Sequence, residues 1–129
     1  MKKKYLIFRL LTLLFVLGTV ILLFIPKGVV IDEITYSYVS KVVFTKYGFI
    51  PLLINIGCLI IFVSSIVSIF INKRVLNISI ASFLFLLTIL SFSFLAFSKT
   101  VINWIHPIFC LISFIFNGLI VFFDFKDNQ

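Results

Sequence analysis

The chain has 129 residues, of which 63% are hydrophobic and only 12% are charged, and its net charge is +7. A soluble domain is usually about half apolar and about a quarter charged, so this chain could not cover its surface with polar groups in water. Its basic residues gather at the ends of apolar segments, which argues against nucleic acid and indicates the anionic surface of a lipid bilayer as the partner. Alanine occurs only at Ala81 and Ala96 while Phe, Ile, Lys and Asn are plentiful, a usage typical of AT-rich bacterial genomes.

Four long uncharged stretches predict four membrane-spanning helices. They hold 17, 26, 24 and 24 residues between charged positions, and crossing the hydrocarbon takes about 20 apolar residues. We expect Arg9 to extend toward the interface, which lengthens the first stretch. Lipid offers the backbone no hydrogen-bond partners and the stretches do not alternate like barrel strands, so helices are favoured. The expected spans are Tyr5–Ile25, Phe49–Ile71, Val75–Phe97 and Ile105–Phe123.

The first span resembles the front of a secretory signal, because the basic segment 1–4 precedes an apolar run. That run ends at Phe24, Pro26 and Lys27 without a small-x-small cleavage site, and no cysteine lies near it. We therefore expect an uncleaved signal anchor that forms the first helix.

The segment 27–48 is the only connection with room for structure outside the membrane, and its pattern fits two structures. An alternation typical of a short strand places Ile34, Tyr36 and Tyr38 on one side. Helical spacing instead aligns Val30, Ile34, Tyr38 and Val42, with Asp32, Glu33, Ser40 and Lys41 opposite. A lone hairpin is marginal in water, whereas an amphipathic helix can rest on the membrane surface, so we favour the interfacial helix.

The remaining connections are short: Asn72 to Arg74, and the segment 98–104. They predict an all-α, up-down-up-down bundle of four transmembrane helices in a single membrane domain, 1–129, with a short extracytoplasmic segment. Basic residues concentrate on the cytoplasmic side of membrane proteins, which predicts a multi-pass protein of the cell membrane with both termini cytoplasmic. On that orientation the inside holds Lys2, Lys3, Lys4, Lys73, Arg74 and Lys126, and the outside holds Lys27, Lys41, Lys46 and Lys99.

Polar residues recur at helical spacing within each span, most clearly in the fourth. Membrane helices pack through small residues and interhelical hydrogen bonds, so these stripes are expected to face the bundle interior. A polar path for a small solute or ion is the alternative. In the fourth span the stripe is His106, Cys110, Ser113, Asn117 and Asp124, opposite Ile108, Ile112, Ile115, Leu119 and Phe122. The other stripes include Arg9, Thr12 and Thr19, then Gly57, Ser64 and Ser68, then Asn77, Ala81, Thr88 and Ser91.

Two of the candidate positions carry charge. Arg9 lies about one turn inside the first span and Asp124 closes the fourth at the same side. A charge near lipid is costly unless it is paired or reaches the interface. We expect these two residues to contact each other, the alternative being that Arg9 reaches lipid phosphates.

The remaining chemistry-bearing residues are His106 and the two cysteines, Cys58 and Cys110. His106 is expected at the outer interface, either as a pH sensor or as a residue that tolerates the headgroup region. The cysteines are expected to be unreactive packing residues, because a thiolate is disfavoured in the bilayer. Together the three residues fall short of a four-ligand zinc site. No catalytic motif and no cofactor or metal site is predicted.

The sequence therefore predicts a non-enzymatic accessory or interaction protein of the bacterial cytoplasmic membrane, such as an immunity-type protein against a pore-forming peptide. Its partner would be another membrane protein or a second copy of the chain. An oligomeric small transporter or channel is the alternative. A lipid-modifying enzyme that uses His106 with Asp32 or Glu33 is a third, and it lacks a visible nucleophile–base arrangement.

Overall fold

The computed structural model describes residues 3–25, 29–71, 73–97 and 105–127. Within these ranges it contains five helices and one two-stranded sheet. The predicted connection 98–104, like the turn residue Asn72, lies outside the described residues. The helices are α1 (Lys3–Leu23), α2 (Lys41–Tyr47), α3 (Phe49–Phe70), α4 (Arg74–Phe97) and α5 (Ile105–Asp127), and the strands are β1 (Val29–Ile31) and β2 (Ile34–Tyr36).

Four helices are long and apolar enough to cross a membrane, which makes the chain compatible with a multi-pass membrane protein. These segments satisfy their own backbone hydrogen bonds, as an apolar solvent requires, despite many β-branched and aromatic residues that would disfavour helices in water. The prediction of a helical protein with four long apolar helices is confirmed. The apolar segments are Tyr5–Leu23, Phe49–Phe70, Arg74–Phe94 and Ile105–Lys126.

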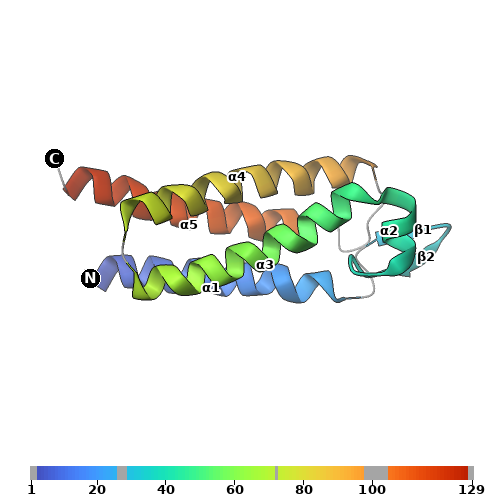
Figure 1. Ribbon diagram of the computed structural model, residues 1–129, viewed down its shortest axis with the longest axis horizontal. Helices are drawn as coiled ribbons and strands as arrows, with labels where there is room; N and C mark the ends of the chain where they lie inside the picture. Colours follow the sequence, from blue (N-terminus) through green and yellow to red (C-terminus); the bar gives the residue numbers. More distant parts are fainter. Residues whose placement is uncertain (1–2, 26–28, 72, 98–104, 128–129) are drawn as a thin grey trace.

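The four long helices lie side by side and enclose a common interior, which we call the helix core (Figure 1). Helix α1 packs against α3 and α5, and α4 packs against the same two helices. Both chain termini lie at one end of the bundle, together with the end of α3 and the start of α4 (Figure 1). We call this end the terminal end. The strands and α2 lie at the opposite end.

Residues 29–47 form a cap over that opposite end, which we call the capped end (Figure 1). Strands β1 and β2 pair in antiparallel register, with Ile31 opposite Ile34. Asp32 and Glu33 form the two-residue turn with φ of 52° and 67°, and positive φ at both turn positions matches the twist of a hairpin. The buried side chains of Ile31, Tyr38 and Val43 pack the cap against the helix core.

The expectation of an interfacial helix over this segment is therefore wrong for residues 29–36, and a helix forms only from Lys41 to Tyr47. The hairpin is marginal by itself, but here it packs on the helix core, which provides the burial that an isolated hairpin lacks. Gly48, with φ of 58°, turns the chain from α2 into α3. Glycine adopts this left-handed conformation without the steric cost of a Cβ atom.

Candidate functional site

Most residues of the predicted polar stripes are buried in the helix core, but Ser64, Ala81 and Asp124 are only half-buried. On α5, Ile108, Ile115 and Phe122 are 41–58% exposed, while Asn117 is 3% exposed. The inward and outward sides predicted for this helix are confirmed. The buried polar set comprises Arg9, Thr12, Thr19, Asn55, Ser65, Ser68, Asn77, Thr88, Ser91, His106, Ser113 and Asn117.

At the terminal end, Arg9 is buried among the helices, and the expectation that its side chain extends to the lipid interface is wrong. Its side chain is 2% exposed, and its guanidinium Nη1 donates a hydrogen bond to the backbone oxygen of Ser68. Ser68 lies in the last turn of α3, where carbonyl oxygens lack partners within the helix. Arg9 thus caps α3 from α1, and its positive charge opposes the negative end of the α3 dipole.

Asp124 closes the same end on α5. Its Oδ2 atom accepts a hydrogen bond from Arg74 Nε at 2.8 Å in a salt bridge that joins the start of α4 to the end of α5. The Arg74 guanidinium also lies over the Phe125 ring, 4.6 Å from its centroid. The direct contact between Arg9 and Asp124 stays a prediction.

Between the two ends of the core, polar side chains bond to helix backbones. Asn117 Nδ2 donates to the backbone oxygen of Asn77 at 3.0 Å and so links α5 to α4. The hydroxyl groups bond within their own helices, as Ser113 does to Phe109 O at 2.8 Å and Thr88 does to Leu84 O at 2.7 Å. Because these hydroxyl protons are already donated to carbonyl groups, the side chains serve helix packing.

Near the capped end, a cluster forms that we call the thiol–imidazole cluster: Cys58, Ser91, His106 and Cys110. His106 Nε2 lies 3.6 Å from Cys58 Sγ, and His106 Nδ1 lies 4.0 Å from Cys110 Sγ. Ser91 Oγ approaches Cys110 Sγ at 3.9 Å, so the cluster draws on α3, α4 and α5.

The cap covers this cluster through Tyr38. The Tyr38 ring centroid lies 5.2 Å from that of His106 and 5.7 Å from that of Phe94. The backbone oxygen of Tyr38 accepts a hydrogen bond from Asn55 Nδ2 at 3.1 Å, which ties the cap to α3. Burial raises the pKa of the Tyr38 phenol, so this group is uncharged at neutral pH.

His106 is only 1% exposed, so protein and not lipid headgroups surrounds its side chain, while its depth at the outer interface stays a prediction. The sequence placed His106 just before Pro107 at the start of a span, and it gave no sign that residues 29–47 fold back over that end. Sequence reasoning also treated Cys58 and Cys110 as separate packing residues. Their shared depth in two spans was the available signal, but depth alone does not tell which helices face each other.

The chemistry of the cluster is that of thiols and a base. The two nitrogens of His106 approach different sulfur atoms, which is not the convergence on one point that a metal ion needs. Across the described residues 3–25, 29–71, 73–97 and 105–127, no group of three or more His, Cys, Asp or Glu residues is arranged to hold a metal ion.

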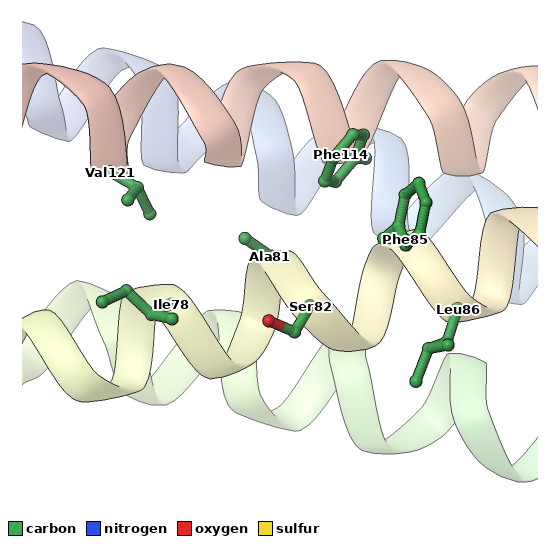
Figure 2. A pocket seen from close by; sticks show the side chains of 7 residues that line it. All are labelled: Ile78, Ala81, Ser82, Phe85, Leu86, Phe114 and Val121. Carbon is green, nitrogen blue, oxygen red and sulfur yellow. The ribbon is translucent and has the colours of Figure 1, made fainter.

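A second candidate site is an apolar groove of about 470 Å³ on the outer surface between α4 and α5. Phe114 and Val121 reach from α5 toward α4, while α4 presents the small side chain of Ala81 between the helices (Figure 2). Phe85 meets Phe114 at the end of the groove nearer the cap, with ring centroids 5.5 Å apart. Ser82 contributes the one hydroxyl of the lining.

Comparison with models of protein families, with curated proteins and with solved structures gave no significant match.

Proposed function

We propose that the protein is a four-helix bundle that crosses the bacterial cell membrane up-down-up-down and binds a transmembrane helix of another membrane protein, without enzymatic activity. Four apolar helices of sufficient length support the crossing. The predominance of basic residues at the terminal end supports cytoplasmic termini. The groove between α4 and α5 is the observation that carries the binding role.

The groove suits a helix because of the size of its side chains. Lipid tails are as apolar as leucine, so membrane helices associate through close packing and polar contacts rather than through hydrophobicity. Ala81 and Ser82 leave space on α4 for a neighbouring backbone, and Phe85 with Phe114 bounds that space. The Ser82 hydroxyl lies where it can bond across such an interface, which a lipid acyl chain cannot do.

The interior supports a solute pathway less well. A pathway needs polar groups that are available to the solute, whereas Thr12 and Ser68 donate to carbonyls of their own helices. Large buried side chains, among them Leu84 and Ile61, fill the core between the polar positions. The polar stripes therefore serve packing on this proposal, and vesicles reconstituted with the protein should show no added solute flux.

Site-specific photo-crosslinking in native membranes tests the proposal. A photoreactive phenylalanine replaces Ser82 in the groove, and the matched control replaces Leu14, which is 60% exposed on α1. We expect a discrete protein adduct from position 82, and only lipid adducts from position 14. An Ala81→Trp change fills the groove and should abolish the adduct from position 82, whereas Leu14→Trp should leave it intact.

Two results would overturn the binding role. One is lipid adducts alone at position 82, and the other is an adduct made only of two copies of this chain. Reporter fusions at the two ends test the orientation, and an extracytoplasmic signal from either end contradicts it.

A further inference from the structure

The thiol–imidazole cluster brings two thiols together from helices that do not neighbour each other around the helix core. Cys58 belongs to α3 and Cys110 to α5, and each of these helices packs against α1 and α4. Both cysteines are fully buried, and each sulfur lies within 4.0 Å of a nitrogen of the same His106 ring. A covalent bond between the two sulfurs would therefore tie the core across its centre.

His106 is placed to move protons for both thiols. Its two ring nitrogens lie 3.6 Å from Cys58 Sγ and 4.0 Å from Cys110 Sγ. A neutral imidazole carries one accepting and one donating nitrogen, so it can take the proton of one thiol while it donates toward the other sulfur. The thiolate, and not the thiol, is the nucleophile in sulfur oxidation.

The cluster is asymmetric in a way that distinguishes the two sulfurs. Ser91 Oγ lies 3.9 Å from Cys110 Sγ, so that sulfur has both a hydroxyl and an imidazole to stabilise negative charge. This surrounding favours Cys110 as the first thiolate, with Cys58 as the second thiol that completes a disulfide.

A buried polar acceptor without a partner in the described part of the chain lies one helical turn from Cys58 on α3. Asn55 lies one helical turn before Cys58 on α3 and is 7% exposed. Its Oδ1 atom has no hydrogen-bond partner among the described residues, and a buried acceptor without a partner is costly. A neutral hydrogen-bond donor about the size of water satisfies it, and hydrogen peroxide is such a molecule.

We propose that Cys58 and Cys110 form a peroxide-oxidised site that closes into a disulfide between α3 and α5. His106 takes the Cys110 proton, and the sulfur attacks one peroxide oxygen. The O–O bond breaks, and the leaving hydroxide takes that proton from His106 to become water, which leaves a sulfenic acid on Cys110.

In the second step, His106 takes the Cys58 proton, and the Cys58 sulfur attacks the Cys110 sulfur. The S–S bond forms as the S–O bond breaks, and a second water leaves. Two thiols are oxidised and one peroxide is reduced to two waters.

The test uses the reduced full-length protein in mild detergent, treated with hydrogen peroxide, quenched, and alkylated after denaturation. Intact mass spectrometry should show the loss of two hydrogen atoms and no alkylation, and peptide mapping should find Cys58 joined to Cys110. Three results would each overturn the proposal: alkylation of both cysteines, a sulfinic acid without a disulfide, or a disulfide between two chains.

Variants test the assigned roles. In Cys58→Ser, dimedone should trap a sulfenic acid on Cys110, and in Cys110→Ser it should trap far less on Cys58. His106→Gln should slow disulfide formation by about tenfold or more, since it removes the base. Asn117→Ala is the matched control, because Asn117 lies farther along the same face of α5, and it should keep the wild-type rate. An unchanged rate in His106→Gln that elutes like the wild type contradicts the role of the imidazole.

Discussion

At the terminal end, charged residues bind across helix ends, whereas at the capped end the polar residues are neutral and lie beneath residues 29–47. Arg9 caps α3, and Arg74 pairs with Asp124. At the other end, Tyr38 covers His106, and sulfur and hydroxyl groups are the remaining neighbours. Arg9 and Asp124 at one end, and His106 and Ser91 at the other, belong to polar stripes of the same helical spacing.

The difference shows that helical spacing in the sequence predicts which side of a helix a residue lies on, but not which residues it contacts. Charges can be held at the terminal end because helix termini supply unpaired carbonyl groups and a favourable dipole there. The capped end has its own protein cover, so neutral groups can stay dry. The two ends should therefore respond differently to substitution.

The largest expected effect is at the capped end. Tyr38→Ala removes a ring that is 4% exposed and packs on His106 and Phe94, and we expect a loss of about 3 kcal/mol or more in the free energy of unfolding. Hydrogen exchange in residues 29–47 should rise while exchange near Arg9 stays unchanged. Tyr38→Phe, which keeps the ring, is the control and should cost less than about 1 kcal/mol. Equal increases in exchange at both ends would show that the cap is not a separate unit.

At the terminal end, Arg9→Met keeps an apolar stem and removes the guanidinium that binds Ser68 O. We expect a loss of about 2–3 kcal/mol, the range for a hydrogen bond to a charged group with a carbonyl left unpaired. Unfolding in mixed micelles measures it.

The same variant tests the predicted contact with Asp124. If Arg9 and Asp124 are coupled, Arg9→Met costs less in an Asp124→Asn background than in the wild type. Identical costs in both backgrounds would mean that the contact is absent.

A smaller effect is expected where helices approach closely. A Cβ atom at Gly18 would lie 2.8 Å from the Phe109 ring, whereas one at Gly118 would meet nothing within 4 Å. Gly18→Ala should therefore cost about 1–3 kcal/mol through overpacking. Gly118→Ala should be neutral or slightly stabilising because alanine favours the helix. Thermal unfolding in detergent compares them, and a reversed order would refute the close packing of α1 on α5.

The smallest effect is expected for Arg74→Ala. The Arg74 side chain is 43% exposed, and salt bridges open to solvent contribute about 0–1 kcal/mol. The loss should shrink further in high salt, since ions screen the pair. A cost above that of Arg9→Met, or one that salt does not change, would show that this pair and not Arg9 holds the terminal end.

Much of the core could be predicted from the sequence, because lipid allows few alternatives for a backbone. Uncharged length predicted the four long helices, and polar spacing on the fourth span predicted which side of α5 is buried. The cap could not be predicted in the same way. Its residues fit both a strand and a helix, and burial of Ile31 and Tyr38 against the helix core decided between them.

By itself, the sequence determined where the four long helices run and which face of α5 turns inward, since apolar length and periodicity act within one segment. The tertiary structure alone decided which inward residues meet. It brought Cys58 and Cys110 close to the two nitrogens of His106. It also placed Arg9 at the end of α3 and Asp124 in a salt bridge with Arg74. These pairings depend on how separate helices are arranged around the core, and no periodicity within a single helix carries that information.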